Sequence, residues 1–195
     1  MWKMAASNSI RYIDFNNAAE WESWLGNHHN KQEDAWLRIA KKGSGVQSIT
    51  IAEALDIALC YGWIDSHRKS FDQQYYLQRY SPRRTKSPWS LVNVKKAEQL
   101  IETGRMKDPG YAEIDLARKD GRWDSAYESQ KTAIVPPDLV SALEHHEQAR
   151  QAFDRLDKTA QYMIFLPILK AATERSRITQ LQKAIAKLEA AGQPH

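Results

Sequence analysis

The sequence predicts an α+β fold: a small, mostly antiparallel sheet of about three strands, flanked by helices and followed by an all-helical C-terminal half. Three observations support this prediction. Three short segments between residues 35 and 80 have the pattern of strands. Helical periodicity of apolar residues flanks these segments and continues without strands beyond the Pro136-Pro137 pair. The 195 residues, 42% of them apolar, can bury one core and a small appended subdomain.

The first helix and the first strand follow from side-chain spacing. The helix is predicted over residues 18–29, because Trp21 and Leu25 recur at helical spacing. The strand is predicted over residues 35–42, where apolar side chains alternate between two faces. The loop Gly43-Ser44-Gly45 lies between a strand and a helix, as phosphate-binding loops do, but it lacks the Gly-Lys-Ser/Thr ending of a Walker motif. We therefore expect a plain flexible loop there.

The helix after this loop has signals at both ends. Thr50 and Glu53 form a capping-box signature, in which each side chain binds the backbone amide of the other residue. The helix is predicted over residues 51–61, and Gly62 is placed to end it in a left-handed conformation. Cys60 lies near its apolar end, so we expect a buried thiol of low reactivity. A single cysteine also excludes an internal disulfide.

The remaining elements follow from turn and helix-end signals. Residues 63–69 and 73–80 are predicted to be two strands joined by a short turn. The Ser87-Pro88 pair starts a predicted helix that ends at Gly104, and a second helix covers residues 111–120. The predicted helices beyond the Pro136-Pro137 pair cover residues 138–145, 148–156, 158–170 and 174–190.

These elements predict a chain of two parts. Residues 1–135 form the α+β core, and residues 136–195 form a helical part. We expect the helical part to pack on the core and not to fold independently of it.

The basic charge is concentrated in one segment of the chain. The net charge is only +4, but ten Lys and Arg residues oppose three Asp and Glu residues between His67 and Lys107, a local net charge of +7. No segment approaches the roughly 20 apolar residues of a membrane span, and the first residues lack the apolar run of a signal peptide. We therefore expect a cytoplasmic protein without a membrane span.

Aromatic and charged side chains in and just before this segment indicate a binding site. Arginine forks bind carboxylate or phosphate through two hydrogen bonds, and tryptophans supply a flat apolar wall. Such a set suits a ligand that carries an anionic group and an apolar or planar part. Alternatively, the carboxylate pairs with an arginine and the tryptophans belong to the core. The predicted ligand-binding residues are Trp63, Asp65, Arg83, Arg84, Trp89 and Asn93.

Several separate motifs in one order also point to a known family. They are Glu53-Ala-Leu, Leu59-Cys-Tyr-Gly-Trp-Ile-Asp65, Arg79-Tyr-Ser-Pro-Arg83, Ser87-Pro-Trp-Ser90, Asn93, Gly104-Arg-Met106 and Gly121-Arg-Trp123. Over most of its length the chain resembles the YdeI/OmpD-associated family, also labelled bacteriocin-protection proteins. The resemblance implies a link to tolerance of antimicrobial peptides or envelope stress, and it implies no particular reaction.

Three functions are compatible with this sequence. The leading one is a non-catalytic cytoplasmic binding protein that recognises an anionic small molecule or a protein partner. The second is an enzyme on an anionic substrate, with Asp65 or Glu53 as acid/base and the Arg83-Arg84 pair as the anion clamp. The third is a nucleic-acid binder that uses the basic, aromatic strand at residues 73–80. We expect no cofactor, and no metal site, because the side chains of adjacent histidines on a helix diverge.

Overall fold

The structure, a computed structural model, describes residues 3–5 and 8–192, and the chain forms two compact units. The N-terminal unit comprises Met1–Ser87 and Asn93–Trp123. The C-terminal unit comprises Pro88–Val92 and Asp124–His195. It therefore includes residues ahead of the predicted boundary at 135/136. That boundary, and the dependence of the helical part on the core, stay predictions.

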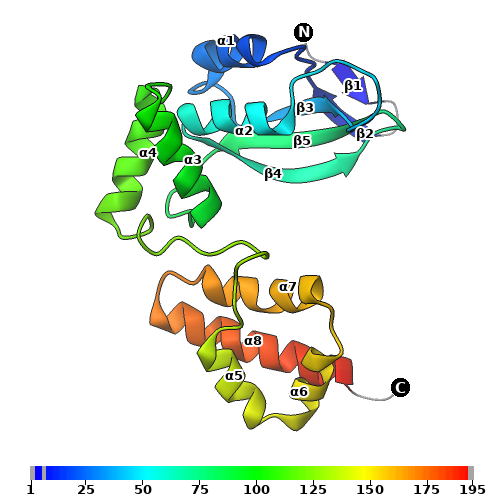
Figure 1. Cartoon of the computed structure of the whole chain (residues 1–195), viewed down its shortest axis with the longest axis vertical. Coiled ribbons are helices and arrows are strands. Elements are labelled where there is room, and N and C mark those ends of the chain that lie inside the picture. Colours follow the sequence, from blue (N-terminus) through cyan, green and yellow to red (C-terminus); the bar gives the residue numbers. More distant parts are fainter. Residues whose placement is uncertain (1–2, 6–7, 193–195) are drawn as a thin grey trace. The chain divides into compact units, whose positions relative to one another are not determined.

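The N-terminal unit contains the predicted three-stranded sheet (Figure 1). Its strands are β3 (Ala35–Ala40), β4 (Trp63–Ser70) and β5 (Tyr75–Pro82). They are antiparallel and lie in the order β3-β5-β4. Strand β5 begins at Tyr75, later than predicted, because the Asp72 carboxylate accepts hydrogen bonds from the amides of Gln74 and Tyr75 and so extends the turn.

A second, two-stranded sheet was not predicted. Strand β1 (Lys3–Ala5) pairs with β2 (Asn8–Tyr12) in antiparallel register. The pairing is irregular between Met4 and Ala5. Such short strands carry little alternation, so their sequence gives no usable strand signal.

Four helices accompany the sheet in this part of the chain. They are α1 (Ala18–His28), α2 (Ile51–Cys60), α3 (Leu91–Glu102) and α4 (Asp108–Lys119). The capping box of α2 is confirmed: the Thr50 hydroxyl accepts from the Glu53 amide, and the Glu53 carboxylate accepts from the Thr50 amide at 2.9 Å. The left-handed end of α2 is also confirmed, since Gly62 has a φ of 71°.

Two helix starts differ from the prediction. Helix α3 begins at Leu91 and not at Pro88, because the backbone at Trp89 and Leu91 pairs with Tyr127 through hydrogen bonds of 3.0 and 2.8 Å. A tertiary pairing therefore overrides the local helix-start signal. Helix α4 begins at Asp108, earlier than predicted, with proline in its first turn.

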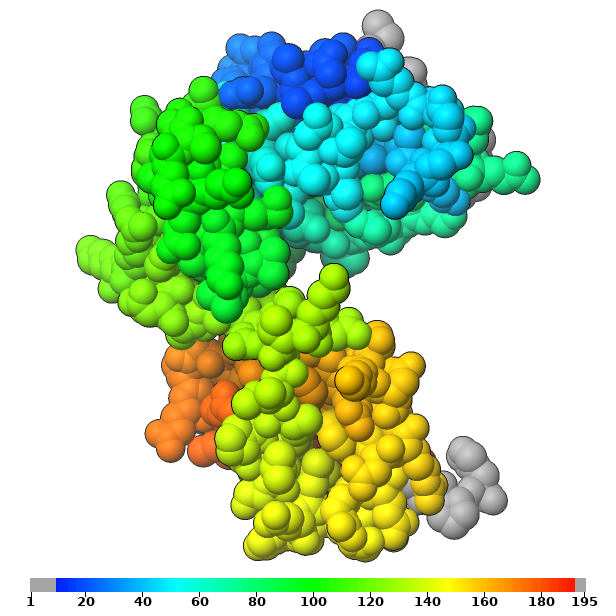
Figure 2. Space-filling model, viewed as in Figure 1, coloured from blue at the N-terminus to red at the C-terminus, as the bar shows by residue number. Residues whose placement is uncertain are grey.

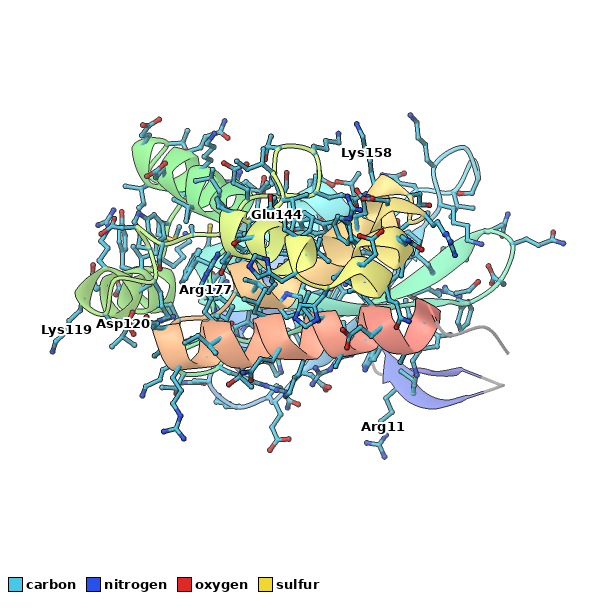
Figure 3. All side chains as sticks on the ribbon, turned by 90° about the horizontal axis from the view of Figure 1, so that it is seen from below. Arg11, Lys119, Asp120, Glu144, Lys158 and Arg177 are labelled. Carbon is cyan, nitrogen blue, oxygen red and sulfur yellow. The ribbon has the colours of Figure 1, made fainter. Side chains whose placement is uncertain are left out.

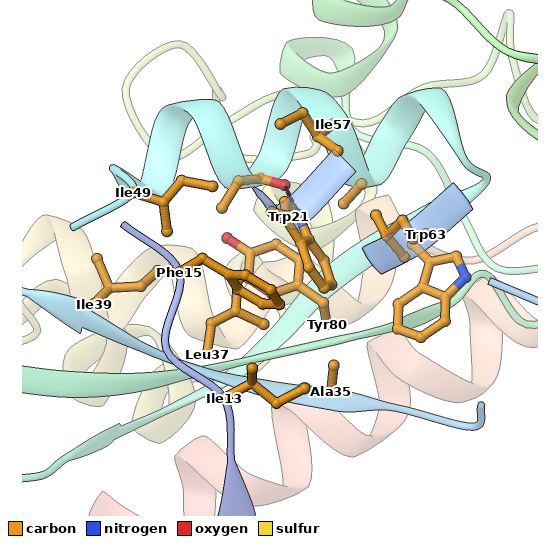
Figure 4. Packing of buried hydrophobic residues seen from close by; sticks show 13 residues of the cluster. Ile13, Phe15, Trp21, Ala35, Leu37, Ile39, Ile49, Ile57, Trp63 and Tyr80 are labelled. Carbon is orange, nitrogen blue, oxygen red and sulfur yellow. Dashed lines mark hydrogen bonds between the residues drawn. The ribbon is translucent and has the colours of Figure 1, made fainter. Parts of the chain in front are cut away.

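The core of the N-terminal unit lies between the sheet and helices α1 and α2 (Figure 4). It includes Trp21 of α1 and Trp63 of β4, both almost fully buried. The Trp21 indole donates to the Ala54 carbonyl of α2 at 3.1 Å. The Tyr80 hydroxyl points toward α2 and has no hydrogen-bond partner among the described residues. The thiol of Cys60 is buried, as expected, and burial raises its pKa to about 11.

The C-terminal unit is helical, so the predicted α+β fold with a helical C-terminal half is confirmed. Its helices are α5 (Pro137–Glu144), α6 (Glu147–Asp154), α7 (Lys158–Leu169) and α8 (Glu174–Gly192). Arg177 of α8, labelled in Figure 3, joins three of them. Its guanidinium donates to both oxygens of Asp138 on α5, at 2.6 and 2.8 Å, and to the Ile168 carbonyl on α7, at 3.3 Å.

Candidate functional site

A cavity of about 780 Å³ opens at one end of the three-stranded sheet in the N-terminal unit. It is bounded by the chain from Ala40 to Ile51 and, across the sheet, by Arg68, Ser70 and Tyr76. The segment that bounds it is partly exposed, and atoms in its colour range, light blue to cyan, lie on the surface shown in Figure 2. The volume falls within the range of small-molecule pockets.

The loop that borders the cavity is held at both ends. Its first residue, Lys41, donates its amide to the Gln74 carbonyl at 2.7 Å, and Ile49 donates to the Phe15 carbonyl at 3.0 Å. Between them Gly43 and Gly45 have φ values of 82° and 71°, which residues with a Cβ rarely adopt. In the part of the chain that the structure describes, the amides of these two glycines donate no hydrogen bond. The loop is therefore shaped by its glycines and fixed at its ends.

Arg68 projects from β4 at the opposite wall. Its Nε donates to the Gln78 Oε1 atom at 3.0 Å, and its guanidinium lies 4.7 Å from the centre of the Tyr76 ring. Gln78 is itself buried and donates to the His67 carbonyl at 3.3 Å. Two contacts thus fix the guanidinium, the hydrogen bond to Gln78 and the cation–π contact with Tyr76.

A β-bulge explains why Arg68 and Asp65 share a face of the sheet. Asp65 lies opposite Tyr80 and Arg68 opposite Gln78, with a register shift between the two pairs. Between these pairs two residues of β4, Ser66 and His67, oppose one residue of β5, Arg79, and the extra residue turns Arg68 toward the side that Asp65 already occupies. Regular alternation would place these two side chains on opposite faces.

The charged side chains that line the cavity are all cationic. Lys41, Lys42 and Arg68 line it, and no Asp or Glu does. The Lys41 Nζ atom donates to the Asp72 carbonyl at 2.6 Å, whereas Lys42 is exposed. Three positive charges in a lining that contains no carboxylate favour an anionic occupant.

Glu53 is occupied by its structural role. Hydrogen bonds from the Thr50 amide and hydroxyl lower the pKa of its carboxyl group. A carboxylate that is easily ionised and already engaged in a helix cap is a poor proton donor near neutral pH.

The six predicted ligand-binding residues do not line this cavity. Trp63 is 1% exposed, and its indole donates to the His29 carbonyl at 3.1 Å. Arg83 is buried, with its amide bound to the Gly62 carbonyl at 3.0 Å, so it lies beside the start of β4. The structure therefore brings Trp63, Asp65 and Arg83 to one end of the β4–β5 pair.

The other three predicted residues are in different surroundings. Arg84 is exposed, and Asn93 is half-buried on α3. Trp89 is buried and belongs to the C-terminal unit. A ligand-binding role for the set stays a prediction.

Glu113 of α4 is a charged residue near this end of β4 that sequence reasoning missed. Burial raises the pKa of its carboxyl group, and the charges of Arg83 and Arg122 lower it. Its Cγ atom lies only 3.1 Å from where a Cβ would stand on Gly62. No spacing signal in the sequence relates α4 to β4, so this proximity could not be predicted.

Asp65→Asn is expected to stabilise the protein at neutral pH. Burial raises the pKa of the Asp65 carboxyl group above 3.8, against smaller effects of its own amide, Arg68 and Arg83. Since the folded state then binds the proton more tightly than the unfolded state, stability falls as the pH rises from about 4 through the raised pKa. The asparagine side chain has no charge to bury, so the variant is expected to be more stable than the wild type at pH 7. In thermal unfolding this difference in stability is expected to vanish below pH ~4. Asp115→Asn, at an exposed position of α4, is the control.

Destabilisation by Asp65→Asn would contradict this prediction. A loss of stability in Asp65→Asn at pH 7 would show that the charged carboxylate interacts favourably with the two arginines by more than its burial costs.

Neither a metal cluster nor a membrane helix is present in the described part of the chain. No three His, Cys, Asp or Glu side chains gather within reach of one ion there. Over the same residues, no helix combines the length and the apolar character that crossing a bilayer requires.

The fold and the cavity define an α+β protein with a cationic pocket, followed along the chain by a helical unit. Residues 13–113, just over half of the chain, match the family model described as Domain of unknown function (DUF8412). Residues 132–191 match the model described as Bacteriocin-protection, YdeI or OmpD-Associated. The chain therefore belongs to the first family, and its residues 132–191 are similar to the YdeI/OmpD-associated family.

The predicted resemblance is thus confirmed, on a shorter stretch than expected. Most of the motifs that suggested the YdeI/OmpD-associated family, such as those at residues 59–65 and 79–83, lie instead within residues 13–113, which match the DUF8412 model. Comparisons with curated proteins and with solved structures found no match.

Proposed function

We propose that this chain is a cytoplasmic binding protein that recognises an anionic small molecule and contributes to bacterial tolerance of bacteriocins or envelope stress. The observation that carries the binding proposal is the 780 Å³ cavity lined by three cationic side chains and no carboxylate. The tolerance part is supported only by the description of the family that residues 132–191 match. The proposal assigns the ligand to this cavity, whereas a ligand-binding role for the six residues predicted from the sequence stays a separate prediction.

The other two functions have less support in the structure. The basic charge that would attract nucleic acid is partly neutralised, since Arg79 in the basic strand donates to the Asp34 carboxylate at 2.7 Å and Lys96 on α3 donates to the Asp56 carboxylate at 2.7 Å. Phosphate-backbone binding needs cations that are free to replace counterions. An acid/base role for Glu53 competes with its helix cap.

Titration with inorganic phosphate tests the proposal. Saturable shifts of the Gly43 and Gly45 amide signals are expected in ¹H–¹⁵N spectra of the full chain, with an affinity that falls as the salt concentration rises. Lys42→Ala is expected to weaken phosphate binding about fivefold, the equivalent of one charge contact of about 1 kcal/mol at the surface.

Lys95→Ala is the matched control for this titration. It removes the same charge from an exposed position on α3 that does not line the cavity. Equal loss of affinity in the two variants, or no saturable shift in the wild type, would refute the proposal.

A further inference from the structure

We infer that the ligand carries a planar aromatic ring next to a terminal oxyanion, and that Arg68 and Tyr76 recognise this combination. This inference rests on the proposed anion-binding function and adds the chemical class of the ligand. The observations that support the ligand class are the geometry of the Arg68 side chain and the apolar residues that line the cavity near it.

The first step is the orientation of Arg68. A surface arginine normally samples many rotamers, and ordering it on binding costs free energy. Here the Nε–H group donates to the Oε1 atom of the buried Gln78, and the guanidinium carbon lies over the Tyr76 ring, 4.7 Å from its centre. Gln78 is held in turn through the His67 carbonyl. The guanidinium is therefore preorganised before any ligand arrives.

The second step concerns the outer edge of the Arg68 guanidinium, formed by its two terminal nitrogens, which is available to a ligand. Within the described residues, the two terminal nitrogens of Arg68 have no hydrogen-bond partner. Together these nitrogens form the fork that fits two oxygens of a carboxylate or a phosphate. Since Arg68 lines the cavity, its side chain provides a directed oxyanion contact in addition to its charge.

The third step is the apolar part of the cavity. Val46 and Ile51 line it on the loop side, and the Tyr76 ring lines it on the sheet side. A purely inorganic anion would leave this apolar surface against water. A ring beside the guanidinium would cover the surface and gain from stacking, because guanidinium planes stack on aromatic faces. The walls and the fork thus favour a molecule with both parts.

Two matched pairs of probes test this inference on the full chain. Phenyl phosphate and methyl phosphate carry the same charge and differ in the ring, as do benzoate and acetate. The ring is expected to increase affinity about tenfold within a pair, as measured by calorimetric or NMR titration. Comparison of phenyl phosphate with benzoate shows whether phosphate or carboxylate is the preferred oxyanion, and a ring preference within either pair supports the inference.

Arg68→Lys separates recognition of the ring from general attraction of anions. Lysine keeps the charge but has neither a plane nor a fork, so the ring preference is expected to fall to about threefold or less. Lys95→Arg is the reverse exchange at an exposed position of α3 that does not line the cavity, and it is expected to leave the preference unchanged. An unchanged preference in Arg68→Lys would overturn the assignment to Arg68.

The outcomes distinguish this inference from the proposed function. Equal affinity within both pairs, together with saturable binding of inorganic phosphate, would overturn the aromatic ligand class and leave the anion site standing. Absence of phosphate binding would refute the anion site itself, and the ring inference would fail with it.

Discussion

Gly110→Ala is expected to destabilise the N-terminal unit by about 3 kcal/mol, at the upper end of the usual cost of overpacking. A Cβ at this position in α4 would stand 2.5 Å from the Cys60 carbonyl oxygen and 2.8 Å from that of Leu59, and it would also collide with the Met106 sulfur. Methionine can move aside, but the two carbonyls belong to the end of α2. The expected result is a lower urea midpoint with an unchanged slope.

Gly26→Ala is the matched control, since Gly26 is also a helical glycine. The nearest atom to its added Cβ would be the Tyr61 hydroxyl oxygen at 3.6 Å, an ordinary contact. Alanine is the better helix former, so this variant is expected to gain up to about 1 kcal/mol. Similar effects of the two variants would mean that α4 does not lie as close to α2 as the structure places it.

This close approach connects helix packing to the cavity. Gly110 lets α4 lie directly on the carbonyls that end α2, while the opposite end of α2, at Ile51, borders the cavity. Gly62 contributes to the same contact, because a Cβ there would stand 2.8 Å from the Pro109 carbonyl oxygen. Two glycines thus fix the position of the helix whose first residue helps to form the proposed site.

Local signals predicted much of the fold. The capping box at Thr50 and Glu53 involves residues three apart, so the sequence contains all of its partners. The same holds for the alternation in β3 and for the glycine that ends α2. The start of α3 was predicted wrongly, because its determinant is the pairing with Tyr127, which lies far along the chain.

The proposed site could be predicted only in part. The Gly43-Ser44-Gly45 loop was identified as a glycine-rich connection, but Arg68 was not singled out as its partner across the cavity. The β-bulge between Asp65 and Arg68 determines which face of the sheet carries Arg68, and no residue pattern in β4 predicts this bulge. The sequence also could not tell a tryptophan that lines a pocket from one that fills a core, because both are single aromatic residues beside apolar neighbours.

Trp63→Ala is expected to cost about 3–5 kcal/mol of unfolding free energy, which is enough to unfold much of a marginally stable protein. The Trp63 indole is almost fully buried, with its ring centre 6.3 Å from that of Trp21 and 6.2 Å from that of Trp24. Its removal would leave a large cavity among rings that cannot collapse to fill it. Chemical denaturation followed by circular dichroism measures the loss.

Trp63→Phe decides between packing and binding at this position. Phenylalanine keeps most of the apolar volume and loses the hydrogen bond to the His29 carbonyl, so the expected cost is only about 1 kcal/mol beyond repacking. A folded Trp63→Phe protein is expected to bind inorganic phosphate with unchanged affinity, because Trp63 does not line the cationic cavity. Loss of phosphate binding in this folded variant would instead place the ligand beside Trp63, Asp65 and Arg83, as the sequence first indicated.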